Sequence, residues 1–72
     1  MKVSKAVKTL EKHGFEITGN LGSYEAERNG VFIRFFENGL GTDECSKFTY
    51  DSKWSCAPTY GMSLRGVLKS AN

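Results

Sequence analysis

Apolar and polar residues alternate along two short runs, 23–28 and 31–36, that are joined by an Asn-Gly pair at 29–30. An Asn-Gly pair suits a two-residue type I′ turn, because both of its residues take a positive φ. The pattern therefore predicts a β-hairpin closed by this turn. In that register Glu25 lies opposite Arg34, which predicts a cross-strand ion pair.

The alternation also divides the side chains of the hairpin between two faces, because successive residues of a strand point to opposite sides. One face is apolar and is expected to pack on the core: Tyr24, Ala26, Val31, Ile33 and Phe35. The other face mixes aromatic and charged side chains: Glu25, Glu27, Phe32, Arg34 and Phe36.

Two further stretches have the periodicity of amphipathic helices. The first has an apolar stripe made of Val3, Ala6, Val7 and Leu10. We expect it to begin near Ser4, as its cap, and to end at Gly14. The second is shorter and begins after Ser63 as N-cap, with Leu64, Val67 and Leu68 as its buried stripe.

The remaining strands are expected on either side of the hairpin. Residues 15–18 alternate as a strand and 19–22 form a turn, while 45–50 can return as a fourth strand. Residues 51–61 are expected to be an irregular connection, since Pro58 interrupts a strand ladder. The chain is therefore predicted to be one α+β domain over 1–72. It has a three- to four-stranded antiparallel meander with an N-terminal helix and a short C-terminal helix on one face, in the order α-β-β-β-(β)-α.

Composition narrows the class of protein. The chain has 72 residues, 12% aromatic residues and a formal net charge of +2, which fits a small folded domain and argues against a strongly acidic DNA mimic. No apolar run is long enough to span a membrane and no secretion signal precedes the first helix, so we expect a cytoplasmic protein. In that compartment Cys45 and Cys56 are expected as two reduced thiols, the alternative being a disulfide.

Candidate reactive side chains do not form a recognisable site. Cys45, Cys56 and His13 are possible zinc ligands, but no closely spaced ligand pair such as C-x-x-C is present. A Cys–His catalytic pair also lacks any local signature. We therefore expect no metal, no cofactor and no enzymatic activity.

The mixed face of the hairpin is the strongest candidate for a binding site. Phe32 and Phe36 flank Arg34, and aromatic and Arg side chains are enriched at protein interfaces. Apolar side chains on a solvated sheet face also call for a cover. We expect a protein partner or a second copy of the chain there, with Trp54 as a further contact. The alternative is that residues 51–61 cover this face within the same chain.

A nucleic-acid surface is the alternative function. Lys5, Lys8 and Lys12 follow one side of the first helix and are placed to contact phosphates, although such a stripe is also typical of a solvated helix face. Phe32 and Phe36 resemble a stacking platform for single-stranded nucleic acid. Carboxylates beside them oppose phosphate binding.

The order of these features resembles a group of small proteins. The lysine-rich stretch 5–15, the aromatic hairpin and the closing stretch 60–65, Tyr-Gly-Met-Ser-Leu-Arg, are similar to small uncharacterised accessory proteins of bacteriophages and other mobile elements. The resemblance implies a compact accessory or modulator protein that binds a host macromolecule. It carries no functional residue over to this chain.

Overall fold

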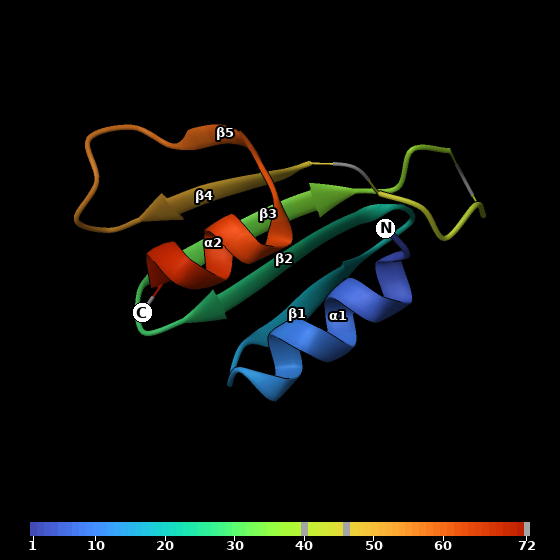
Figure 1. Ribbon diagram of the computed structural model, residues 1–72, viewed down its shortest axis with the longest axis horizontal. Coiled ribbons are helices and arrows are strands. Elements are labelled where there is room, and N and C mark those ends of the chain that lie inside the picture. Colours follow the sequence, from blue (N-terminus) through green and yellow to red (C-terminus); the bar gives the residue numbers. More distant parts are fainter. Residues whose placement is uncertain (40, 46, 72) are drawn as a thin grey trace.

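The computed structural model describes residues 1–39, 41–45 and 47–71. Within them, two helices and one five-stranded sheet follow each other along the chain (Figure 1). The elements are α1 (Val3–Lys12), β1 (Glu16–Asn20), β2 (Ser23–Arg28), β3 (Val31–Phe36), β4 (Phe48–Ser52), β5 (Thr59–Met62) and α2 (Leu64–Ala71). All neighbouring strands pair antiparallel in sequence order. The predicted α+β class and meander are confirmed, with one strand more than expected.

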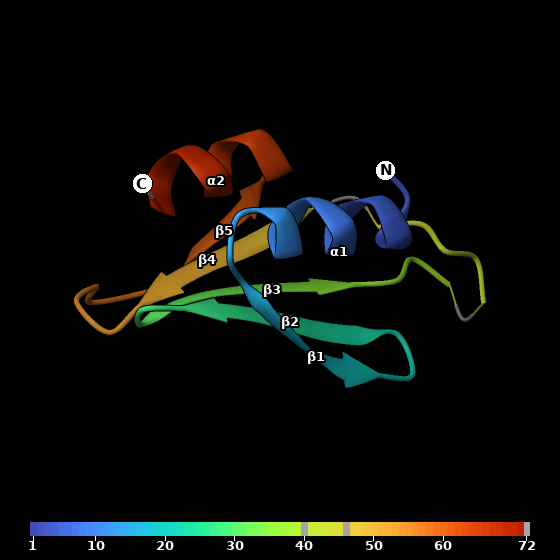
Figure 2. The same ribbon diagram turned by 90° about the horizontal axis from the view of Figure 1, so that it is seen from below.

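Both helices lie on the same face of the sheet, and the opposite face carries no element (Figure 2). The core fills the space between the helices and the sheet: Val3, Ala6, Leu10, Phe15, Ala26, Val31, Ile33, Phe35, Cys45, Phe48, Leu64 and Val67. Phe35 is fully buried at its centre, with ring centroids 5.4 Å from Tyr24 and 5.1 Å from Phe48. Each helix therefore contributes its apolar stripe and leaves its polar side in solvent.

The central hairpin has the predicted register. Arg28 pairs with Val31, and Asn29 and Gly30 take φ values of 50° and 83°. Positive φ at both turn residues is what a type I′ turn requires. Glu25 lies opposite Arg34, so the two faces of the hairpin are divided as the alternation predicts.

The first strand is longer than its sequence pattern suggested. It continues to Asn20, and only Leu21 and Gly22, with φ of 51° and 85°, form the turn to β2. Gly19 is a strand residue with a φ of 121°, and a Cβ there would overlap the carbonyl oxygen of Ser23. The turn residues predicted at 19–22 thus serve two purposes, a close backbone approach and the turn itself.

The segment 51–61 is not an irregular connection throughout, so that prediction is wrong in part. Strand β4 extends to Ser52, and β5 begins directly after Pro58 at the edge of the sheet. Proline is compatible with this position because it immediately precedes an edge strand. A register shift between Phe48 and Tyr50, together with Gly61 at a φ of 70°, gives β5 a bulge. The expected fourth strand at 45–50 begins later, at Phe48, and Ser46 lies outside the described residues.

The two helix starts differ from each other. Ser63 caps α2 as predicted, since its Oγ accepts the backbone N–H of Gly66 at 3.1 Å. Ser4 lies inside α1 and does not cap it. Instead Asp43 reaches the first turn from a distant loop, accepting the Ser4 N–H at Oδ1 (3.1 Å) and the Ser4 hydroxyl at Oδ2 (2.9 Å).

Candidate binding surfaces

The sheet surface turned away from the helices is the first candidate site, and we call it the outer face. Its members alternate with the buried strand residues and lie opposite one another in the register: Glu16, Glu25, Glu27, Phe32, Arg34, Phe36 and Asp51. Figure 2 shows this side of the sheet without any covering segment. The outer face carries four carboxylates and one guanidinium, so it is acidic.

Arg34 does not offer a free positive charge on the outer face. Its Nε lies 3.0 Å from Glu25 Oε2, and its Nη2 lies 3.7 Å from Asp51 Oδ2. The predicted cross-strand ion pair is confirmed, and a second carboxylate joins it. Because Arg34 is balanced by two carboxylates, the aromatic side chains beside it lie in an environment that repels phosphate.

Phe36 and Leu21 give one end of the sheet an exposed apolar pair. Phe36 is 58% exposed and Leu21 is 86% exposed. The two strand ends are joined there, because the N–H of Glu37 donates to the carbonyl of Gly22 at 2.8 Å. Phe32, further along β3, is half-buried. Sequence reasoning overlooked Leu21, although a bulky residue directly before a turn glycine is a signal that could have identified it.

Trp54 lies at the other end of the sheet. It belongs to the loop between β4 and β5, where the N–H of Lys53 donates to the carbonyl of Gly30 at 3.0 Å. Its indole is 70% exposed, with Lys53 Nζ 5.1 Å from the ring centroid. In Figure 1 this loop extends beyond one end of the sheet, while the turn at Leu21 lies at the other end. The structure therefore separates Trp54 from Phe36, and the loop does not cover the outer face.

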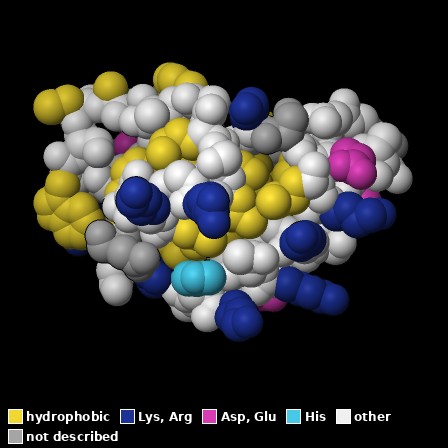
Figure 3. Space-filling view, in the orientation of Figure 1, with side chains coloured by type: hydrophobic (Ala, Val, Ile, Leu, Met, Phe, Trp, Pro, Cys, Tyr) yellow, Lys and Arg dark blue, Asp and Glu magenta, His cyan; other side chains and the backbone are white. Residues whose placement is uncertain are grey.

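The opposite side of the molecule forms a basic layer, which we call the helix layer. Its exposed charged side chains, on α1, α2 and the residue before α1, are Lys2, Lys5, Lys8, Lys12, Arg65 and Lys69, with Glu11 the one carboxylate in these described elements. Figure 3 shows Lys and Arg side chains around an apolar strip on the helix side of the molecule, with an acidic group at one edge. The predicted lysine stripe is thus solvent-exposed on α1, and α2 adds two more cations beside it.

The candidate reactive side chains, Cys45, Cys56 and His13, lie in different environments. Cys45 is buried, and this burial raises the pKa of its thiol above the ordinary value, whereas Cys56 is exposed; both are free thiols. His13 is exposed at the end of α1, with its Nδ1 2.8 Å from the Thr9 carbonyl. Within residues 1–39, 41–45 and 47–71, no three His, Cys, Asp or Glu side chains gather as a metal site, and no cavity is found.

Comparisons with known proteins identify no relative. No protein-family model, no curated protein and no solved structure matches this chain. In the described part of the chain, neither helix has the length and apolar character needed to cross a membrane.

Proposed function

We propose that this chain is a non-catalytic accessory protein, encoded by a bacteriophage or another mobile element, that binds a host or phage protein through the outer face. The observation that carries the proposal is the exposure of two apolar side chains at the same end of the sheet: Phe36 on the uncovered face and Leu21 in the adjoining turn. Large apolar side chains that gather on an exposed surface are typical of interaction sites. Phe32 is a second aromatic side chain of the same face, half-buried and separated from Phe36 by Arg34 along β3.

The backbone of Leu21 adds a second argument. A non-glycine residue with a φ of 51° is strained, and a leucine has no side-chain hydrogen bond to compensate. Its side chain is also almost completely exposed, so it gains little from burial in the core. A contact with a partner explains both costs, because the turn presents an apolar side chain on a rigid hairpin end.

The charges on the outer face indicate the chemistry of the partner. Glu27 and Asp51 lie on either side of Phe32 in the register, and Glu16 lies beyond Glu27. Glu25 pairs with Arg34 between Phe32 and Phe36. A complementary partner surface therefore has an apolar patch for Phe36 and Leu21 and, beside it, Lys and Arg side chains that face the carboxylates. The same charges oppose a dimer in which two copies pack outer face to outer face, so we propose a partner of different sequence.

Capture from nuclease-treated host lysate with the tagged chain tests this proposal. Phe36→Ala is expected to capture much less of a protein that the wild-type chain captures. Truncation of an interface anchor weakens the binding free energy by about 2 kcal/mol or more, which is roughly a 30-fold loss of affinity. Trp54→Ala is the matched control, since it also removes an exposed aromatic side chain but lies at the other end of the sheet.

Equal capture by the wild-type chain and Phe36→Ala would contradict the outer face as the site. Loss by Trp54→Ala alone would move the site to the loop between β4 and β5. A protein that is captured only from untreated lysate, and equally well by Phe36→Ala, would be held through nucleic acid and would contradict the outer face as its site.

A further inference from the structure

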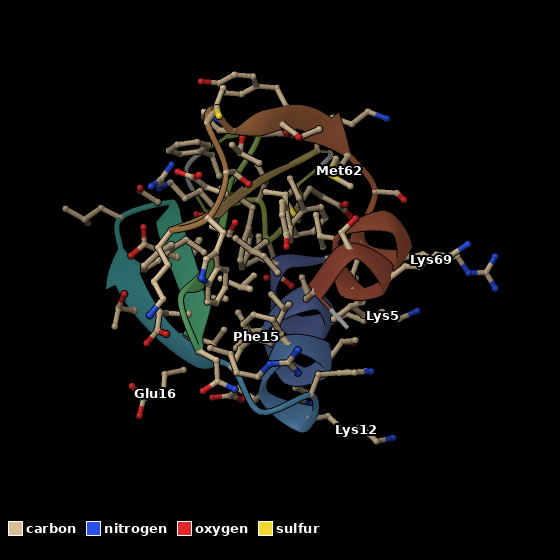
Figure 4. All side chains as sticks on the ribbon, turned by 90° about the vertical axis from the view of Figure 1, so that its left-hand side faces the viewer. Lys5, Lys12, Phe15, Glu16, Met62 and Lys69 are labelled. Carbon is tan, nitrogen blue, oxygen red and sulfur yellow. The ribbon has the colours of Figure 1, made fainter. Side chains whose placement is uncertain are left out.

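The helix layer concentrates the positive charge that the outer face lacks. Figure 4 shows Lys5, Lys12 and Lys69 on the helix side of the molecule and Glu16 on the opposite side. The overall formal charge is only +2, so this charge separation arises from the fold. A polyanion that approaches the helix layer meets cations on two helices. Glu11 is the one carboxylate within the described helices, and Asp43 and Glu44 add two more at the start of α1.

The cations of the helix layer are spaced as rows. Lys5, Lys8 and Lys12 recur at intervals of three and four on α1, which places them along one side of the helix. Arg65 and Lys69 are four apart on α2 and form a second row. Among the described residues, the ion pairs of the chain involve Arg34 and the N-terminus and leave both rows out. Both rows are therefore available to phosphates.

The helix layer lacks the groups that recognise unpaired bases. The exposed large apolar side chains of the described chain are Met1, Leu21, Phe36, Trp54 and Tyr60, and none of them belongs to α1 or α2. Binding of single strands relies on such aromatic side chains, on which the bases stack. Lysine ammonium groups contact phosphates as point charges and need no base. The chemistry of this surface thus fits the backbone of a double helix.

We propose that the helix layer is a second binding surface, specific for double-helical nucleic acid and independent of base sequence, formed by Lys5, Lys8 and Lys12 of α1 with Arg65 and Lys69 of α2. An acidic peptide would match the same charges, but in the described chain neither helix exposes a large apolar side chain to anchor it, unlike the outer face with Phe36. This surface acts independently of the outer face.

Fluorescence anisotropy with a labelled duplex of about 20 base pairs tests the proposal. If each cation of the two rows contacts one phosphate, log K falls against log salt with a slope of about −4 to −5, since each contact contributes about −0.9. The double variant Lys5→Glu/Lys69→Glu, which changes one residue in each row, is expected to weaken binding at least about 10-fold near 0.1 M salt. Lys47→Glu/Lys53→Glu is the matched control, because it changes the net charge equally at exposed residues outside both helices.

Three results would overturn the proposal. The first is the absence of duplex binding at about 50 mM salt. The second is an equal loss of affinity in the two double variants, which would show a general effect of net charge. The third is tighter binding of a single strand or of poly-glutamate than of the duplex, since either would assign the surface to another ligand. Phe36→Ala is expected to bind the duplex with wild-type affinity. The test of the helix layer is therefore independent of the test of the outer face.

Discussion

The guanidinium of Arg28 lies over the ring of Phe15, with Cζ 4.6 Å from the ring centroid. From this position its Nη1 donates to the carbonyl of His13 at 2.6 Å and its Nη2 donates to the carbonyl of Ala71 at 3.0 Å. His13 follows the last turn of α1, and Ala71 ends α2. One side chain on β2 therefore ties the ends of both helices to the sheet and complements the negative ends of their dipoles.

Arg28→Ala is expected to lower the free energy of unfolding by about 2 to 3 kcal/mol, through loss of the cation–π contact and of two charged hydrogen bonds. Arg28→Lys is expected to be intermediate, because one ammonium cannot replace the planar fork at both carbonyls. Urea denaturation measures both changes. Arg65→Ala is the control, since this exposed residue of α2 lies outside the described ion pairs. A stability of Arg28→Ala within about 0.5 kcal/mol of the wild type would refute the role of Arg28.

Asp43 is expected to stabilise α1 although it lies far from it in sequence. Asp43→Ala removes both hydrogen bonds to Ser4 and places alanine at a φ of 57°, so we expect a loss of about 1 to 2 kcal/mol. Asp43→Asn keeps an acceptor oxygen and tolerates the left-handed backbone, and it should lose less. Thermal unfolding of the two variants tests this order. Wild-type stability of Asp43→Ala would show that the cap contributes little.

The two thiols are expected to differ in reactivity. Burial raises the pKa of Cys45, so near pH 8 this thiol is both protonated and inaccessible, whereas Cys56 is exposed. A disulfide reagent should therefore modify one thiol per folded chain rapidly and the second only after denaturation. Cys56→Ser should abolish the rapid phase. Two rapid thiols, or a rapid phase that survives in Cys56→Ser, would contradict the burial of Cys45.

Leu21→Asn is expected to stabilise the fold by about 0.5 to 1 kcal/mol, because Asn tolerates a positive φ far better than leucine does. The substitution also removes an apolar side chain that is 86% exposed and contributes little to the core. For a domain of this size a gain of 1 kcal/mol raises the melting temperature by about 4 to 8 °C. Gly19→Ala, two residues earlier, is the contrasting variant. It should destabilise strongly, because its Cβ overlaps the Ser23 carbonyl.

Local signals in the sequence were sufficient to predict the central hairpin and the start of α2. The Asn29–Gly30 turn fixed the register of the hairpin, and the serine before Leu64 marked the start of α2. These features depend on neighbours in the chain, so the sequence pattern contains them.

Features that depend on distant residues could not be predicted in this way. The cap of α1 comes from Asp43 rather than from Ser4, and β5 exists because β4 supplies a partner for a short segment after Pro58. The hairpin residues of the outer face were predicted from the alternation, but its acidity also involves Glu16 and Asp51 on other strands, and Asp51 takes part in the neutralisation of Arg34. The exposure of Leu21 likewise results from the geometry of the turn, and the pattern of apolar residues does not predict it.

The affinity of the Leu21→Asn variant for the captured partner tests the outer face most directly, because this variant separates binding from folding. We expect a higher melting temperature together with a dissociation constant at least about tenfold larger, measured by calorimetry with the purified partner. A variant that is more stable and binds as tightly as the wild-type chain would contradict this role for the exposed end of the sheet, since Leu21 would then take no part in recognition.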